Sequence, residues 1–148
     1  QGLYAEAEPL CRRSLAIREK VFGPDHPAVA ESLNNLAELF RAQGLGAQAE
    51  PPAARALAIR EKALEPDHPH VAESLNGLAL VYLDTGQHDR AETLLERALT
   101  IREKVLGPEH PDLAASLESL ARLYRATERP NEAEELEARA ARIRSIKR

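Results

Sequence analysis

Three histidines are the residues of this chain with the most obvious capacity for chemistry. His26, His68 and His110 each follow an acidic residue, precede a proline and recur every 42 residues. Histidine is a common zinc ligand, but its nitrogen must come within about 2.0–2.1 Å of the ion. Because equivalent points of successive helical units lie about 8–10 Å or more apart, the three side chains cannot converge on one ion. His70 lies close to His68 but has no cysteine or third histidine beside it, so we predict loop structure and no metal site.

The remaining polar residues do not form a recognisable catalytic arrangement either. Ser32, Ser74 and Ser116 recur with the same spacing as the histidines, which indicates a structural role. The sequence contains no glycine-rich phosphate loop, no metal-ligand spacing and no nucleophile followed by a plausible base. The single cysteine, Cys11, stands where a later copy carries Ala53, so we predict that it packs in the core. We therefore expect no enzymatic activity and no cofactor.

Composition narrows the class of protein further. The chain has 148 residues, of which 43% are hydrophobic and 3% aromatic, and its 20 Lys and Arg against 24 Asp and Glu give a net charge of −4. That balance does not favour nucleic acid as a partner. The sequence has neither a signal-peptide-like start nor an apolar run of about 18 residues, so we expect no membrane segment. The lone cysteine is compatible with a reducing compartment, and we expect a cytoplasmic location.

The chain is built from sequence repeats, and these repeats determine where the histidines and the other polar residues lie. The tetrapeptide Ile-Arg-Glu-Lys begins at Ile17, Ile59 and Ile101, and each step is 42 residues. A fourth copy can be followed to the end with more drift, as expected of a terminal cap. We predict a single repeat domain over residues 1–148, divided into a partial repeat at 1–23, full repeats at 24–65 and 66–107, and a C-terminal capping repeat at 108–148.

Each repeat divides into two helices. In the first complete copy an amphipathic segment begins at Pro27, which suits a first helical turn, and closes at Gly44, which suits a left-handed C-terminal cap. A second helix runs from about Ala47 to Leu64. A single hairpin cannot bury its apolar face alone, so the hairpins must stack into a superhelix with a concave and a convex side. The partial repeat would contribute its second helix only, which gives about seven helices in all.

These residues resemble the tetratricopeptide repeat family, and in particular its 42-residue kinesin-light-chain-like class. The pattern of the family's first helix falls on Leu33, Leu36, Ala37 and Phe40, and the turn glycine of the family matches Gly44. In the last copy Glu128 replaces that glycine. The resemblance implies an all-α fold, a right-handed α-solenoid of stacked helix-turn-helix hairpins, the tetratricopeptide-like superhelix.

The resemblance also implies a peptide groove lined by the first helix of each repeat. Asn34, Asn35 and Asn76 are the strongest candidates, because an amide can both donate to and accept from a peptide backbone; simple solvation is the alternative. The family's anion clamp needs basic residues where this chain has Asn34, Ala115 and Ser119, so we do not expect it here. The implied groove residues are Glu31, Asn34, Asn35, Glu38, Arg41, Glu73, Asn76, Leu80, Leu83, Glu118, Arg122 and Arg125.

Two functions remain open from the sequence. The first is a non-enzymatic module that binds an extended peptide or a partner helix in its concave groove, within a larger scaffold or signalling protein. The second is a structural spacer or arm that self-associates through its open N-terminal flank, because the chain starts halfway through a repeat and we expect it to be part of something longer. The sequence of the groove indicates the kind of ligand but does not identify the protein partner.

Overall fold

The computed structural model describes residues 2–146, and over these residues the chain forms helices joined by short loops, with no strand. The prediction of an all-α fold with seven helices is confirmed for the described part. The helices are α1 (Gly2–Phe22), α2 (Pro27–Ala42), α3 (Gly46–Ala63), α4 (Pro69–Asp84), α5 (His88–Leu106), α6 (Asp112–Ala126) and α7 (Pro130–Ser145). The ends of the proposed domain, residues 1, 147 and 148, lie outside the described residues.

Each repeated histidine accepts a hydrogen bond at the start of a helix, and His26 and His68 are the N-cap residues of α2 and α4. The imidazole Nδ1 of His26 accepts a hydrogen bond from the backbone N–H of Ala28 at 3.0 Å, and that of His68 accepts one from His70 at 2.9 Å. The Nδ1 atom of His110 accepts one from Asp112 at 3.1 Å. Each bond satisfies one of the backbone donors left free in the first turn of a helix. This is the loop role predicted for these histidines.

The turns between the two helices of a hairpin require a left-handed residue. Gly44 has φ 77° and Gly86 has φ 78°, and the N–H of Leu45 donates to the carbonyl of Phe40 at 2.9 Å to close the end of α2. This is the Schellman arrangement. Glu128 adopts the same conformation with φ 60°, and it is the only non-glycine residue of the described chain with a positive φ.

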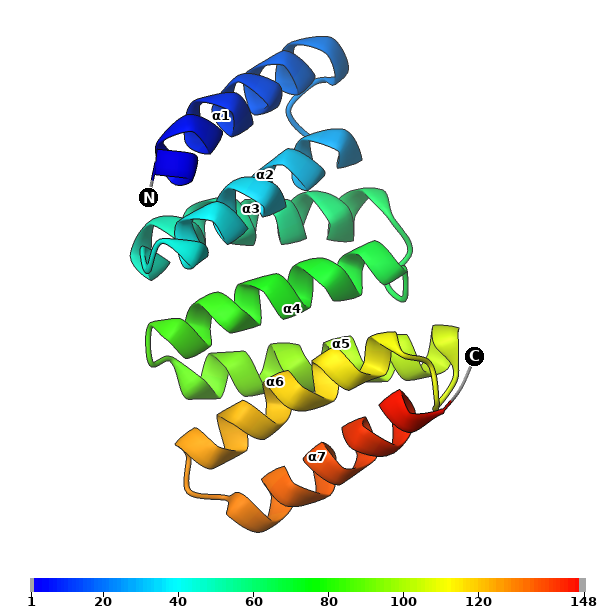
Figure 1. Cartoon of the computed structure of the whole chain (residues 1–148). Coiled ribbons are helices and arrows are strands. Elements are labelled where there is room, and N and C mark those ends of the chain that lie inside the picture. Colours follow the sequence, from blue (N-terminus) through cyan, green and yellow to red (C-terminus); the bar gives the residue numbers. More distant parts are fainter. Residues whose placement is uncertain (1, 147–148) are drawn as a thin grey trace.

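The helices form two layers. Hairpins α2–α3, α4–α5 and α6–α7 stack in order, and α1 packs on α2 at one end (Figure 1). Among the described residues the backbones of α2 and α4, and of α4 and α6, approach each other closely. Successive odd-numbered helices lie farther apart and are joined by ion pairs between long side chains, such as Arg55 with Glu19 and Arg97 with Glu61. Since the more closely spaced side of a curved stack is its concave side, α2, α4 and α6 form the inner layer, and α1, α3, α5 and α7 form the outer layer.

The core lies between the layers and depends on small residues. Ala49, Ala56 and Ala98 are completely buried, which lets neighbouring helices approach closely. Ile59 and Ile101 are only 4% and 3% exposed because the inner helix of their own hairpin covers them. The equivalent residue of α1, Ile17, is 51% exposed, since α1 has no inner helix of its own among the described residues. The apolar face of α1 is therefore open.

Candidate functional site

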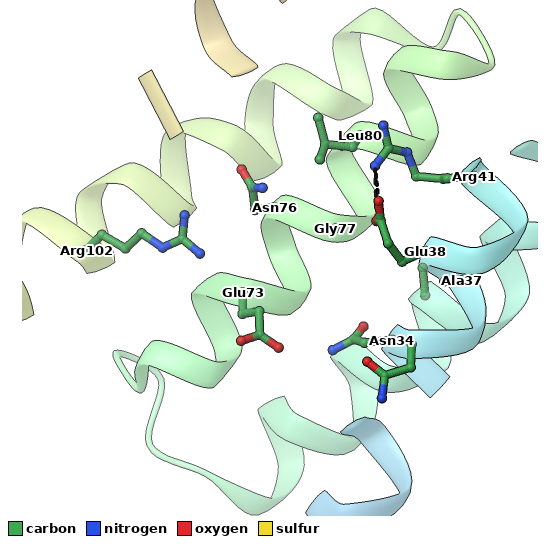
Figure 2. A pocket seen from close by; sticks show the side chains of 11 residues that line it. Asn34, Ala37, Glu38, Arg41, Glu73, Asn76, Gly77, Leu80 and Arg102 are labelled. Atoms are coloured by element: carbon green, nitrogen blue, oxygen red, sulfur yellow. Dashed lines mark hydrogen bonds and ion pairs between the residues drawn. The ribbon is translucent and has the colours of Figure 1, made fainter. Parts of the chain in front are cut away.

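A pocket of about 250 Å³ lies on the inner layer between α2 and α4. We call it the central pocket. Figure 2 shows the side chains of Glu73, Asn76 and Arg102 on one side of it and those of Asn34, Glu38 and Arg41 on the other. Its lining residues are Asn34, Asn35, Ala37, Glu38, Arg41, Ala53, Glu73, Asn76, Gly77, Leu80 and Arg102.

The structure brings the three candidate asparagines together in this pocket but gives them different environments. Asn34 donates from Nδ2 to the hydroxyl of Ser74 at 2.9 Å, so its amide is partly engaged across the α2–α4 junction. Asn35 is exposed. The Oδ1 atom of Asn76 is buried and has no hydrogen-bond partner among residues 2–146. A buried acceptor without a partner costs about 1–3 kcal/mol, which a ligand that donates a hydrogen bond would recover.

Charged residues at one end of the pocket are tied to one another. Arg41 donates to Glu38 at 3.1 Å and to Asp84 at 2.8 Å, and Arg122 donates to the other oxygen of Asp84 at 2.9 Å. Desolvation by itself would raise the pKa of Asp84, but the hydrogen bonds from Arg41 and Arg122 lower that pKa below its usual value. One carboxylate thus bridges all three inner helices.

An arginine of the outer layer reaches into each following hairpin. Arg60 is 3% exposed and donates to the carbonyl of His70 at 3.0 Å and to Glu73 at 3.1 Å. Arg102, its equivalent, donates to the hydroxyl of Ser116 and lines the central pocket. Burial lowers the pKa of the Arg102 guanidinium below its usual value, and the carboxylates of Asp112 and Glu73, acting from a distance, offset part of the shift.

The remaining predicted groove residues lie outside the central pocket. Glu31 pairs with Arg18 at 3.6 Å, Glu118 pairs with Arg144, and Arg125 pairs with Glu137 at 2.7 Å. Arg122 donates to Asp84, so both arginines predicted for the groove on α6, Arg122 and Arg125, are paired with carboxylates.

Leu83 is the prediction that the structure corrects. It is 7% exposed and packs in the core with Leu120 and Tyr124 of α6, so it is not part of an open groove. Leu80, three residues earlier, does line the central pocket.

Arg102 is the charged residue of the central pocket that the groove prediction missed. The prediction considered only the first helix of each repeat, whereas Arg102 belongs to the second helix, α5. A signal was nevertheless present, because Ile-Arg-Glu-Lys recurs in three copies while the glutamate found at Glu31 and Glu73 becomes Ala115 in the third.

Residues 2–146 contain neither a candidate metal site nor a helix that could cross a membrane. No cluster of three or more His, Cys, Asp or Glu side chains in this range has the arrangement of a metal site. None of the described helices combines the length and apolar character needed to cross a bilayer.

Comparisons with known proteins agree with this architecture. The family model for the tetratricopeptide repeat matches residues 1–62, 39–104 and 70–145. The solved structure of a putative kinesin light chain from Podosopora anserina, with nearly identical TPR-like repeats, is 33% identical in sequence and has a TM-score of 0.85. The match covers 99% of this chain and 70% of that one. The predicted kinesin-light-chain-like resemblance is confirmed.

Two further solved structures are similar. BtubC (BKLC) from P. vanneervenii is 29% identical with a TM-score of 0.85 over 97% of this chain, which spans 57% of that protein's chain. The TPR domain of Arabidopsis FLU is 14% identical with a TM-score of 0.68, covers 79% of this chain and 96% of its own, and shares the fold. No curated protein sequence gives a significant match.

Proposed function

The chain belongs to the tetratricopeptide repeat family, and we propose that it is a non-enzymatic module that holds an extended peptide or a partner helix in the central pocket, within a larger scaffold or signalling protein. Repeats of this family are in general protein–protein interaction modules. The observation that carries the proposal is the buried, unpaired Oδ1 atom of Asn76 in a pocket lined by amides from two successive repeats.

The chemistry of the pocket suits a peptide backbone. The Oδ1 atom of Asn76 accepts a backbone N–H, and the exposed amide of Asn35 can bond a carbonyl. Leu80 and Ala37 supply apolar surface for a side chain of the ligand. A ligand that makes these contacts is held largely through its main chain, so the pocket would accept several sequences.

A screen of degenerate peptides against immobilised protein tests the proposal. The change Asn76→Ala should weaken binding of the captured peptides about fivefold, the equivalent of one hydrogen bond of about 1 kcal/mol. Asn131→Ala removes an exposed amide from α7 outside the pocket and should leave affinity unchanged. Equal affinities for the two variants, or no captured peptide at all, would reject the proposed function.

The exposed face of α1 favours a second candidate, a structural arm that self-associates. Leu3, Leu10, Ile17 and Val21 are all at least half exposed and recur at helical spacing. Light scattering over a concentration series distinguishes the two: an oligomer that dissociates in Ile17→Glu supports the arm, and a monomer at all concentrations excludes it. The cytoplasmic location stays a prediction that rests on the single cysteine.

A further inference from the structure

The open apolar face of α1 has nearly the same residues as a face of α5 that an inner helix covers. The corresponding positions, two repeats apart, are Ala7, Leu10, Ser14, Ile17 and Val21 in α1 and Ala91, Leu94, Ala98, Ile101 and Val105 in α5. Four of the five pairs are identical. At one end of the stack, α1 therefore presents a surface whose complement is visible within the same molecule (Figure 1).

The two faces differ in exposure and not in chemistry. Ile101 is buried, because it packs in one cluster with Leu75 of α4. Its equivalent Ile17 is half exposed, and Leu10 is exposed whereas Leu94 is partly buried. Removing contiguous apolar surface from water is favourable, so the face of α1 favours an apolar partner.

The helices that cover the equivalent faces share one feature, an alanine at the closest approach. Ala37 of α2 and Ala49 of α3 lie in one buried cluster, and Ala79 of α4 and Ala91 of α5 lie in another. Because an alanine on each helix lets the two backbones approach closely, a larger side chain on the covering helix would hold it away. Ala7 is the equivalent alanine of α1.

Beyond the function of the central pocket, we propose that the open face of α1 is a second interaction surface, which binds an amphipathic helix of a partner protein. The partner helix runs antiparallel to α1, as α4 does to α5, and its large apolar side chains cover Leu10 and Ile17. An alanine of the partner meets Ala7. Residues 69–84, the α4 segment itself, have this pattern.

A second copy of this chain is a poorer occupant of the face. Its inner helices α2, α4 and α6 are already packed in their own hairpins. Its outer helices lie far apart from one another and meet through long charged side chains, as in the pair of Arg97 with Glu61. At the other end of the stack, α7 has the charged residues Glu137 and Arg144, which pair with α6 and give that end a polar surface.

A fluorescent peptide with the sequence of residues 69–84 is the probe, and anisotropy measures its binding to the whole chain. An isolated helix of this length is marginally stable, so we expect a dissociation constant of about 10–100 µM. Ile17→Glu should weaken binding about tenfold or more, because it places a charge in the apolar contact. Ala16→Glu is the matched control and should leave the affinity unchanged, since Ala16 is exposed and its equivalent Thr100 stays exposed in α5.

A variant of the peptide separates specific docking from non-specific adhesion. Ala79→Leu makes the peptide more apolar, which would strengthen a non-specific contact. In the proposed arrangement the added side chain meets Ala7 and holds the helix away, so we expect binding about tenfold weaker than that of the original peptide. Equal or tighter binding of the Ala79→Leu peptide would reject the proposed packing.

The other occupants of the face would give different results. A wild-type dimer in light scattering that dissociates in Ile17→Glu would assign the face to a second copy and overturn the proposal. Peptide binding that survives in Ile17→Glu but is lost in Asn76→Ala would place the helix in the central pocket, which supports the proposed function and rejects the surface on α1. Failure of the peptide to bind at about 1 mM, well above the expected dissociation constant, would reject the surface as well.

Discussion

Arg41, near the end of α2, donates a hydrogen bond of 2.8 Å to Asp84, the last residue of α4. Their side chains are only 16% and 24% exposed, so this ion pair is better shielded from solvent than the other pairs of the inner layer. Arg122 of α6 donates to the same carboxylate. Asp84 therefore joins three successive inner helices.

Replacing Asp84 by Asn should destabilise the stack. Charge-assisted hydrogen bonds contribute about 1.5–3 kcal/mol each, whereas a carboxylate at a helix C-terminus is unfavourable by about 0.3–1 kcal/mol. The retained amide oxygen keeps part of the bonding, so we expect a net loss of about 1 kcal/mol in the free energy of unfolding at neutral pH. Urea denaturation followed by circular dichroism measures it, with Glu135→Gln at an exposed position of α7 as the control. A variant as stable as the wild type would mean that the bridge contributes nothing.

The contribution of Asp84 should also depend on pH. Its pKa is lowered in the folded state, so the stabilisation is fully present above the unfolded-state pKa of about 3.9 and disappears as the pH falls through the lower folded-state value. The difference in unfolding free energy between wild type and Asp84→Asn should therefore shrink between about pH 5 and pH 2. A difference that stays constant over this range would assign the loss to packing and not to charge.

Ile59 and Ile17 occupy the same position of two repeats and should respond very differently to truncation. Ile59 is buried, so Ile59→Ala should cost about 3 kcal/mol through lost apolar burial and the cavity left behind. Ile17 is half exposed, so Ile17→Ala should cost less than about 1 kcal/mol. Equilibrium unfolding of both variants at low protein concentration provides the comparison. Equal costs would show that another surface covers α1 in solution.

Most of the fold could be predicted because its determinants are local. Pro27 begins α2 where expected, and α3 runs over Gly46–Ala63 against a predicted range of about Ala47 to Leu64. Proline and glycine fix backbone angles within a few residues of themselves, so their effect is visible in the sequence. The 42-residue repetition then requires each hairpin to pack against the next in the same way.

Glu128 holds the left-handed turn position that glycine holds in the earlier hairpins, and Glu128→Gly should stabilise the chain. A left-handed conformation costs a non-glycine residue about 1–2 kcal/mol, and the greater freedom of glycine in the unfolded chain offsets about 0.4–1 kcal/mol of that. We expect a net gain of about 0.5–1 kcal/mol and a higher melting temperature. The reverse change, Gly86→Ala, should destabilise by a similar amount, since Gly86 has φ 78°. A drop in melting temperature for Glu128→Gly would contradict this account.

The candidate site was harder to predict because its chemistry depends on residues far apart in the sequence. The sequence around Arg122 does not indicate its ion-pair partner, because that partner, Asp84, is 38 residues away. Leu83 matched a groove position, but α4 has a neighbour on each side, and α6 buries this leucine. The periodicity of one helix indicates which face is apolar and does not indicate which neighbour covers its last turn.

Ser74 accepts hydrogen bonds beneath the lining of the central pocket, and replacing it by alanine should lower the free energy of unfolding. Its side chain is fully buried, and its hydroxyl accepts hydrogen bonds from Asn34 at 2.9 Å and from Arg60 at 3.1 Å. Ser74→Ala removes the acceptor of the Asn34 amide and one of the three acceptors of Arg60, so we expect a loss of about 1–3 kcal/mol in the free energy of unfolding. Ser145→Ala, at an exposed serine of α7, should change stability by less than about 0.5 kcal/mol. Thermal denaturation of the two variants in parallel decides the matter, because equal melting temperatures would mean that the buried hydroxyl carries no net stabilisation.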